Sequence, residues 1–315
     1  MRDPLGRNIT YLRLSVTELC NLRCRYCMPA EGVEKRRHED MLTEEETVLA
    51  VKAAASLGLS KVRLTGGEPL VKKNILSIAE KAAATPGVRE LCLTTNGIRL
   101  PQLARPLRAA GVRRVNVSLD TLDPAKYAHI TRIGDLSDAL RGLEAALSAG
   151  FERVKINAVL IRGFNDDEIP ALAALTRRWP VDVRFIELMP MGGDLTQGAF
   201  VPGDVVLEKL PELEKLPEDG AVARLYTLPG ALGQVGIISP LSCQFCDRCD
   251  RIRLTADGRI KPCLHQRAEY PLKGLDEAGM RRQFEAAIMN KPPWHGELSY
   301  AAPSQAGRTM DRIGG

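Results

Sequence analysis

Aromatic residues are scarce in this 315-residue chain, at 4% of its length. Few side chains are therefore available on which nucleic-acid bases could stack. The net charge of +5 and the pI of about 8.8 also fall short of the clustered basic surface of a nucleic-acid-binding domain. We expect no nucleic-acid partner, because a mild positive bias suits a small anionic substrate better.

Long hydrophobic runs are missing as well. No apolar run approaches the roughly 18 residues that a membrane helix needs, and residues 1–7 lack the apolar stretch of a signal peptide. We therefore expect no membrane association and a cytoplasmic location, where the eight cysteines stay reduced. The chain also lacks a Walker loop and a catalytic-triad pattern, so hydrolytic chemistry is not indicated.

Three of the cysteines stand close together near the start of the chain. Cys20, Cys24 and Cys27 have C-x3-C-x2-C spacing directly after an apolar segment. Soft thiolates at such spacing select zinc or an iron–sulfur cluster. A structural zinc site uses four closed ligands, whereas three cysteines leave one iron of a four-iron cluster open to another ligand. This first cysteine set therefore predicts an enzyme with an open cluster.

A second cysteine set is formed by Cys246, Cys249 and Cys263. The Asp-Gly pair between the last two predicts a hairpin, which folds Cys263 back beside the other two. A zinc knuckle with Cys243 or His265 as its fourth ligand is the alternative interpretation of this set. Cys243 is therefore either a fourth ligand or a spare thiol near the cluster.

Strand-like and helical segments alternate through the first two-thirds of the chain. The strands are expected at residues 11–16, 61–64, 91–95, 114–119, 154–160 and 183–188. Such alternation predicts a parallel sheet of the α/β class. Six units predict an incomplete (βα)6 barrel of the TIM type, in which active sites lie at the carboxyl ends of the strands.

The unusual motifs gather at that edge of the predicted sheet, and the first of them is the Cys20–Cys27 loop. The others are residues 65–69 (Thr-Gly-Gly-Glu-Pro), residues 94–97, residues 118–120 and residues 189–190, with Lys155 early in the fifth strand. Each alone is explained by turn chemistry, because Gly, Pro and Asn mark strand ends in general. Their convergence beside a cysteine loop favours a functional site.

The alternation ends after about residue 191. From about residue 226 a smaller unit contains the second cysteine set, and residues 276–290 form a helix with an apolar stripe. We therefore expect a barrel over residues 1–225 and a C-terminal region with the second, auxiliary cluster and a Gly-Gly tail over residues 226–315. The residues from 291 onward show no helical or strand pattern.

These motifs resemble the radical S-adenosylmethionine (SAM) superfamily, whose mark is C-x3-C-x2-C at this place in a partial (βα)6 barrel. A narrower resemblance is to the GTP 3′,8-cyclase family of molybdenum cofactor biosynthesis. It is carried by Gly6-Arg7, residues 11–17, the second cysteine set, Arg251-x-Arg253 and residues 307–315. The resemblance implies a lyase that cyclises GTP to 3′,8-cyclo-7,8-dihydro-GTP with SAM, a reductant and two [4Fe–4S] clusters, one held by each cysteine set.

The resemblance also implies a role for individual residues. The implied SAM contacts are Tyr26, Gly66, Gly67, Glu68, Ser118 and Met189. The implied GTP contacts are Arg13, Arg63, Thr94, Lys155, Arg251, Ile252 and Arg253, with Lys61 as a weaker candidate. The residues implied to act directly in the active site are Arg251, Arg253, Gly314 and Gly315.

The partners implied by the resemblance are a flavodoxin- or ferredoxin-type electron donor and a cyclic pyranopterin monophosphate synthase that takes over the product. The chain would be a monomer or a homodimer. Two features depart from the family pattern: Thr-Glu-Leu precedes Cys20 where Thr-Asp-Arg is usual, and Cys243 is extra. The alternatives are a radical SAM peptide-modifying maturase with an auxiliary cluster, a non-enzymatic iron–sulfur electron carrier, and a zinc-structured binding module.

Overall fold

The computed structural model describes residues 1–315 except 35, 193, 196, 218–219, 221 and 315. One 12-stranded sheet runs in the order β12-β11-β10-β1-β2-β3-β4-β5-β6-β9-β8-β7. Its strands are β1 (Tyr11–Ser15), β2 (Lys61–Thr65), β3 (Glu90–Thr95), β4 (Val112–Ser118), β5 (Arg153–Leu160), β6 (Val181–Glu187), β7 (Glu214–Lys215), β8 (Arg224–Thr227), β9 (Val235–Ile238), β10 (Arg251–Leu254), β11 (Arg259–Lys261) and β12 (Tyr270–Pro271).

The centre of the sheet is parallel, and both of its ends are antiparallel. Parallel pairing runs without interruption from β10 through β1 to β6 and on to β9. In the described part of the chain β12 and β7 are the two edges, so the barrel is not closed. This confirms the predicted α/β fold with an incomplete (βα)6 barrel. Strands on both sides of residue 225 belong to one sheet, and the division at that residue stays a prediction.

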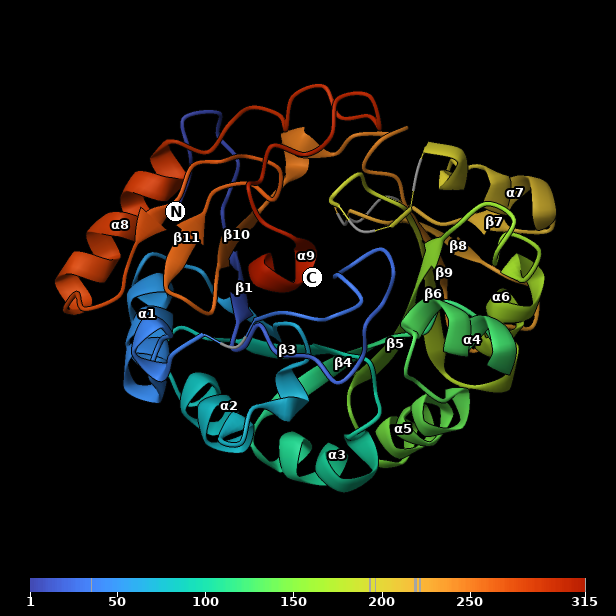
Figure 1. The fold of residues 1–315 in the computed structure, drawn as a ribbon, viewed down its shortest axis with the longest axis horizontal. Coiled ribbons are helices and arrows are strands. Elements are labelled where there is room, and N and C mark those ends of the chain that lie inside the picture. Colours follow the sequence, from blue (N-terminus) through green and yellow to red (C-terminus); the bar gives the residue numbers. More distant parts are fainter. Residues whose placement is uncertain (35, 193, 196, 218–219, 221, 315) are drawn as a thin grey trace.

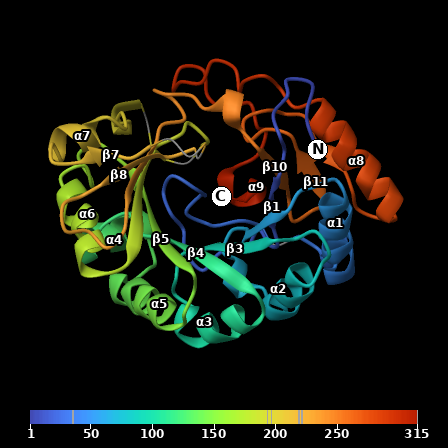
Figure 2. The same ribbon diagram turned by 180° about the vertical axis from the view of Figure 1, so that it is seen from behind.

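Helices surround the curved sheet on its outside (Figure 1). They are α1 (Glu44–Ser56), α2 (Ile75–Ala83), α3 (Leu100–Ala109), α4 (Pro124–Thr131), α5 (Leu136–Ser148), α6 (Ile169–Arg178), α7 (Val205–Lys209), α8 (Glu277–Met289) and α9 (Met310–Ile313). Helix α9 is the exception, because it lies inside the ring in both views (Figures 1 and 2). None of the helices in the described ranges is long and apolar enough to cross a membrane.

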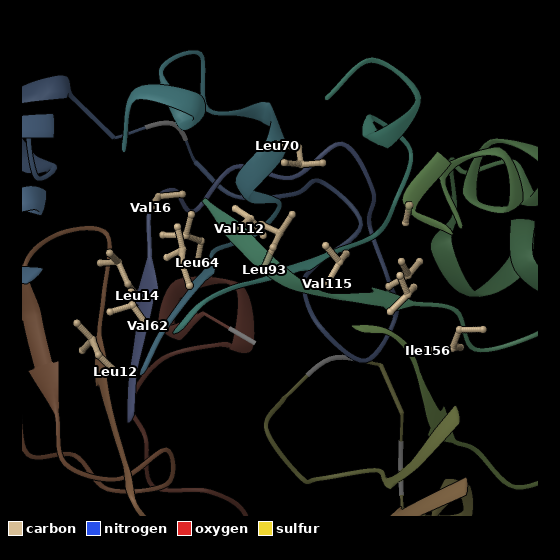
Figure 3. Packing of buried hydrophobic residues seen from close by; sticks show 14 of the residues in the cluster. Leu12, Leu14, Val16, Val62, Leu64, Leu70, Leu93, Val112, Val115 and Ile156 are labelled. Carbon is tan, nitrogen blue, oxygen red and sulfur yellow. The ribbon is translucent and has the colours of Figure 1, made fainter. Parts of the chain in front are cut away.

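Alternation along the strands separates the hydrophobic core from the barrel interior. Leu12 and Leu14 of β1 lie beside Val62 and Leu64 of β2 in the core between sheet and helices (Figure 3). Successive strand residues point to opposite faces, so the residues between these leucines and valines point into the interior. The β1 residue between the two leucines is Arg13. The same strand therefore places leucines in the core and a cation in the barrel interior.

Most of the local predictions are confirmed, and one is wrong. The predicted hairpin is present, with β10 and β11 antiparallel and Gly258 at a φ of +78° in the turn. The helix predicted at residues 276–290 is α8, whose N-cap Asp276 accepts a hydrogen bond from the amide of Gly279. The expectation of no helix after residue 291 is wrong, because Met310–Ile313 form α9. A four-residue helix is too short to produce a periodic hydrophobic pattern.

Candidate active site

The first cysteine set lies on the loop that follows β1, at the carboxyl edge of the sheet. A turn brings two of its members together, with the amides of Cys27 and Met28 donating to the Cys24 carbonyl at 2.9 and 3.1 Å. The amide of Leu22 donates to Sγ of Cys20 at 3.3 Å. Burial raises the pKa of Cys20 to about 11. Burial, followed by repulsion from Cys27, raises the pKa of Cys24 even further. Burial, followed by repulsion from Asp311, does the same for the pKa of Cys27.

These thiols fit an iron–sulfur cluster. Buried thiols with raised pKa values stay protonated at neutral pH unless a metal ion offsets their charge. Among the described residues, no three His, Cys, Asp or Glu side chains are arranged to hold a single metal ion. Thiolates of a four-iron cube bind different irons, so they lie further apart than the ligands of one ion. Three soft thiolates on one loop are the donor set that a cluster with one open iron requires.

The second cysteine set lies at the opposite end of the parallel strands β1 and β10, around the short turn before β10 and just after β11. The pairing of β10 with β11 places Cys263, two residues after Lys261, beside the turn that contains Cys246 and Cys249. Burial raises the pKa of Cys249, but Lys291 and Arg251 outweigh this effect and lower it. The donor set, three mutually close thiols beside cations, fits a second cluster.

The two candidates for a fourth ligand of the second set have other surroundings. Cys243 is exposed, and its charge interacts with Arg224. The ring of His265 is buried, with Nδ1 3.1 Å from Oγ of Ser304 and the ring packed edge-on against His295 at 5.2 Å. Burial lowers the pKa of His265 to about 3, so the ring is neutral.

The Gly-Gly-Glu segment after β2 is packed directly against the first cysteine loop. A Cβ on Gly67 would lie 2.5 Å from the carbonyl oxygen of Glu18 and 2.6 Å from that of Leu19, so only glycine fits there. The amides of Gly67 and Glu68 donate to the carbonyls of Thr17 and Leu19, both at 2.8 Å. The segment therefore fixes the path of the chain immediately before Cys20.

The carboxylate of Glu68 has its own partners. It accepts hydrogen bonds from the amides of Leu70 at 2.9 Å and Asn96 at 2.7 Å and from the hydroxyl of Thr95 at 2.7 Å. Burial raises its pKa to about 7. Glu68 thus ties the ends of β2 and β3 together, and a contact from its side chain to SAM stays a prediction.

The remaining predicted SAM contacts lie along the same edge. The hydroxyl of Tyr26 donates to Asp120 at 2.7 Å, and Asp120 also accepts from the amide of Val159 at 2.8 Å. Burial raises the pKa of Asp120 to about 6. Ser118 is the last residue of β4, and Met189 packs against a small apolar cluster that includes Ile313 of α9.

Arginines from three adjacent strands meet in the barrel interior. Arg13 of β1 is in register with Arg253 of β10 on one side and with Arg63 of β2 on the other. One row further down, Tyr11 is in register with Arg251 and Lys61. The Tyr11 ring has the cations of Lys61, Arg251 and Arg63 at 5.1, 5.7 and 6.0 Å from its centre. We call Arg13, Arg63, Arg251 and Arg253 the arginine cluster.

Positive charge is in excess within the arginine cluster. Burial, and then repulsion from Arg13 and Arg251, lowers the pKa of Arg253 to about 9. Burial and repulsion from Arg63 and Arg251 lower that of Arg13 to about 10. Burial raises the pKa of Tyr11, but the nearby guanidinium groups outweigh it and lower that pKa. A polyanion placed here would relieve the repulsion, which makes the cluster a suitable site for a triphosphate.

Three other predicted GTP contacts have clear positions. Oγ1 of Thr94 accepts a hydrogen bond from Arg63 at 3.4 Å. Lys155 forms an ion pair with Asp182 at 2.7 Å, and burial together with repulsion from Arg184 lowers its pKa to about 8. Ile252 is fully buried in the hydrophobic core, so only its backbone is available to a ligand in the interior.

Arg184 of β6 belongs to this site and was missed by the sequence reasoning. Its Nε is buried and has no hydrogen-bond partner among the described residues. Burial, followed by repulsion from Arg63 and Arg251, lowers its pKa to about 10. Its neighbours Val183 and Phe185 lie in the hydrophobic core, so the side chain of Arg184 points into the barrel interior. An arginine in the middle of a buried strand, two residues after Asp182, was the available signal.

The C-terminal tail reaches the arginine cluster. Nη1 of Arg253 donates to the carbonyl oxygen of Gly314 at 2.5 Å. Gly314 has a φ of +91°, and a Cβ there would lie 2.6 Å from Oγ1 of Thr65 and 2.9 Å from Cβ of Ser15. Gly315 lies outside the described residues, so its predicted role is not tested here.

Comparison with known proteins places this geometry in a family. Residues 14–176 match the Radical SAM superfamily, and residues 181–297 match the family described as Molybdenum Cofactor Synthesis C. The chain is 48% identical over 320 residues to the GTP 3′,8-cyclase of Peptoclostridium acidaminophilum, covering 99% of this chain and 98% of that one. It is 46% identical over 328 residues to the GTP 3′,8-cyclase of Moorella thermoacetica, with full coverage of both chains.

Solved structures of low sequence identity share the fold. Streptococcus suis SuiB bound to S-adenosylmethionine is 12% identical with a TM-score of 0.61, over 84% of this chain and 63% of SuiB. Native anSMEcpe with bound AdoMet is 14% identical with a TM-score of 0.59, over 91% of this chain and 82% of that one. The fold, the two family matches and the full-length relatives agree: the chain belongs to the radical SAM superfamily and, within it, to the GTP 3′,8-cyclase family.

Proposed function

We propose that this protein is a GTP 3′,8-cyclase, a lyase that converts GTP to 3′,8-cyclo-7,8-dihydro-GTP in the first step of molybdenum cofactor biosynthesis. The observation that carries the proposal is the arginine cluster, which lies in the barrel interior between two three-cysteine sets. Burial and repulsion from neighbouring guanidinium groups lower the pKa of Arg13 and Arg253, which supports a concentration of positive charge there. A nucleoside triphosphate supplies the opposite charge.

The first cysteine set, Cys20, Cys24 and Cys27, would hold a [4Fe–4S] cluster with one iron open to SAM. When bound, the cluster and SAM supply a 5′-deoxyadenosyl radical that can abstract hydrogen from a ribose. The chain's own part is to place SAM at the sheet edge. Gly66 and Gly67 pack so closely on the cysteine loop that no side chain would fit between them. The proposed SAM contacts are Tyr26, Gly66, Gly67, Glu68, Ser118 and Met189.

The arginine cluster would bind the triphosphate of GTP. Guanidinium groups match phosphate oxygens with paired hydrogen bonds and keep their charge at neutral pH. Thr94, Lys155, Arg184 and the backbone of Ile252 would complete the wall around the nucleotide. Because the interior is lined by buried side chains, the bound GTP is shielded from water, which protects a radical from side reactions.

The second cysteine set, Cys246, Cys249 and Cys263, would hold the auxiliary [4Fe–4S] cluster on the GTP side of the barrel. Exposure of Cys243 supports a cluster with three protein ligands and one open iron. The tail residues Gly314 and Gly315 would help set the pose of the substrate beside Arg251 and Arg253. The hydrogen bond from Arg253 to the Gly314 carbonyl supports this arrangement.

We propose that the two parts of the chain have separate roles. Residues 1–225 would form the SAM barrel, and residues 226–315 would provide the auxiliary cluster and the GTP-binding tail. Radical SAM chemistry requires an electron donor, and we propose an external protein of the flavodoxin or ferredoxin type. We further propose a cytoplasmic location, a monomer or homodimer, and transfer of the product to a cyclic pyranopterin monophosphate synthase. Reduced, cluster-binding thiols favour that compartment.

An anaerobic turnover assay tests the function. The protein is reconstituted with iron and sulfide, and dithionite, SAM and GTP are added before mass spectrometry of the small molecules. We expect 5′-deoxyadenosine that depends on GTP, together with an isomer of GTP. Deoxyadenosine without any change in GTP would contradict the cyclase and favour a peptide-modifying maturase. No deoxyadenosine from protein with two intact clusters would favour an electron carrier.

A further inference from the structure

The first cysteine loop is built on the end of a helix. Helix α4 ends at Thr131, and its last carbonyls have no partner within the helix. The cysteine loop supplies them: the amides of Arg23 and Arg25 donate to the carbonyls of Thr131 and Ile130, both at 3.0 Å. Nε of Arg25 donates to the carbonyl of His129, also at 3.0 Å. Loop and helix end therefore form one hydrogen-bonded unit.

Arg132, the next residue, has an unusual backbone. Its φ of +65° is the only positive value at a non-glycine residue in the described ranges. An L-residue rarely adopts this conformation, and such strain concentrates at functional positions, where the surroundings enforce it. We therefore expect the Arg132 side chain to make interactions that offset the backbone strain.

The side chain of Arg132 bridges the cysteine loop. Nη1 donates to the carbonyl of Arg23 at 2.5 Å and to that of Met28 at 3.2 Å. These two carbonyls flank Cys24 and Cys27, so one guanidinium group sets the span of the loop that contains both. The Arg132 side chain is only 14% exposed, which keeps water from replacing these hydrogen bonds.

The same guanidinium group also reaches the segment after β6. Nη2 of Arg132 forms an ion pair with Asp194. The amide of Asp194 donates to the carbonyl of Arg25 at 2.8 Å, and its carboxylate lies 3.9 Å from Nη1 of Arg25. Asp194 thus holds the loop between the two cysteines from the other side. The segment that contains Asp194 follows Met189, one of the proposed SAM contacts.

We propose that Arg132 and Asp194 form a clamp that holds the first cysteine loop in the conformation that accepts the SAM-binding cluster. This inference rests on the proposed function only in that the first set binds an iron–sulfur cluster. Arg132 is a positioning residue: it contacts no ligand of the cluster through its side chain and acts through the carbonyls on either side of Cys24 and Cys27. Hydrogen bonds to the groups next to metal ligands hold those ligands in place.

The test uses three substitutions of Arg132 in the full chain. Arg132→Gly removes the clamp and also the backbone strain, Arg132→Ala removes the clamp and keeps the strain, and Arg132→Lys keeps one cation without the planar fork. Arg108→Ala is the matched control, because Nε of Arg108 donates to the carbonyl of Gly150 at 3.0 Å, away from the cysteines. Each protein is reconstituted, and its iron content, its melting temperature without iron and its SAM-dependent electron paramagnetic resonance signal are measured.

We expect Arg132→Gly to melt at the wild-type temperature without iron, to retain about half of the wild-type iron, since two equal clusters are present, and to lose the SAM-dependent signal. Arg132→Lys should recover part of the signal, and Arg108→Ala should equal wild type. Wild-type iron and signal in Arg132→Gly would overturn the clamp and leave the proposed function intact. A wild-type protein without a SAM-dependent signal would overturn both.

If the Arg132 variants melt at a lower temperature, a second variant tests the clamp without this general loss of stability. Asp194→Ala removes a half-exposed carboxylate and leaves the carbonyl contacts of Arg132 in place. The rate at which reconstituted protein loses iron to a chelator is then compared with wild type. We expect a several-fold faster loss from the first cluster, and an unchanged rate would overturn the clamp.

Discussion

Arg253 of β10 is hydrogen-bonded to Gly314 of the C-terminal tail inside the barrel. Nη1 of Arg253 donates to the Gly314 carbonyl at 2.5 Å, although the two residues are 61 positions apart. Arg253 lies between β1 and the second cysteine set, and Gly314 is pressed against Ser15 and Thr65 at the ends of β1 and β2. The tail therefore closes one side of the arginine cluster. One additional carbon atom at Gly314 would displace it.

Gly314→Ala should abolish most of the cyclisation activity. The new methyl group would meet Thr65 and Ser15 at 2.6 and 2.9 Å, and the φ of +91° would be strained as well. A displacement of about 1 Å near a reacting substrate costs on the order of 100-fold in rate, so we expect a loss of that size in GTP conversion. Iron content should stay at the wild-type level, because the cysteine sets are not touched.

Gly150→Ala is the matched control for the tail variant. Gly150 has a φ of +76°, but a Cβ there would meet nothing within 4 Å. It therefore reproduces the backbone strain, about 1–2 kcal/mol, without the collision. Wild-type turnover is expected from Gly150→Ala. Equal activity in the two alanine variants would show that the position of the tail is unimportant for catalysis.

Arg253→Ala should weaken the use of GTP far more than the cleavage of SAM. The loss of charge-assisted hydrogen bonds to a triphosphate, worth about 1.5–3 kcal/mol, predicts a roughly 10- to 100-fold lower kcat/KM for GTP. Arg259→Ala is the control, because Arg259 belongs to the same hairpin but is exposed. SAM cleavage is measured as deoxyadenosine formed in the presence of dithionite. If both activities fell equally, Arg253 would have no specific role toward the substrate.

How much of this site was predictable depends on whether a residue has a local signature. The cysteine sets and the Asp-Gly hairpin have fixed spacings, and the strands have clear hydrophobic patterns, so they were located before the structure was known. Helix α9 has no such pattern, because four residues span barely one turn. Its place in the interior comes from tertiary contacts of Ile313 with Met191 and Ala306.

Arg132 and Arg184 show the same limit at single residues. An arginine in a strand or after a helix is ordinary in a sequence, and the one nearby signal is the buried strand in which Arg184 stands. Arg132 becomes meaningful through its contacts with Arg23 and Met28, which are more than 100 positions away. Arg184 becomes meaningful only when barrel curvature brings β6 opposite β2 and β10. Contacts between residues this far apart in the chain produce no recognisable spacing in the sequence.

GTP binding should weaken as the pH rises through about 8. Burial lowers the pKa of Lys155 to about 8, so below that pH the ammonium is charged and above it the amine is neutral. Only the charged form attracts a triphosphate, so the affinity is highest on the acid side and falls on the alkaline side. Lys155→Arg should move this fall to a higher pH, because a guanidinium group holds its proton to a higher pH than an amine does.

Equilibrium binding of GTP to anaerobic protein between pH 7 and 9.5 measures the effect. Lys52→Arg on the exposed face of α1 is the control and should retain the wild-type pH dependence. A pH dependence that is the same in Lys155→Arg and wild type would assign the titration to another group.

Glu68→Gln should destabilise the protein even without its clusters. The carboxylate accepts from the amides of Leu70 and Asn96 and from the Thr95 hydroxyl, and all three donors are buried. A glutamine has one acceptor oxygen, so its NH2 group must face one of these donors. Leaving a buried donor unpaired costs about 1–3 kcal/mol, and we expect the free energy of unfolding to fall by that amount.

Urea denaturation of the iron-free protein measures this free energy, with Glu45→Gln on the exposed side of α1 as the control. A wild-type midpoint in Glu68→Gln would mean that these hydrogen bonds contribute nothing to the fold and would leave a direct contact with SAM as the reason for this glutamate.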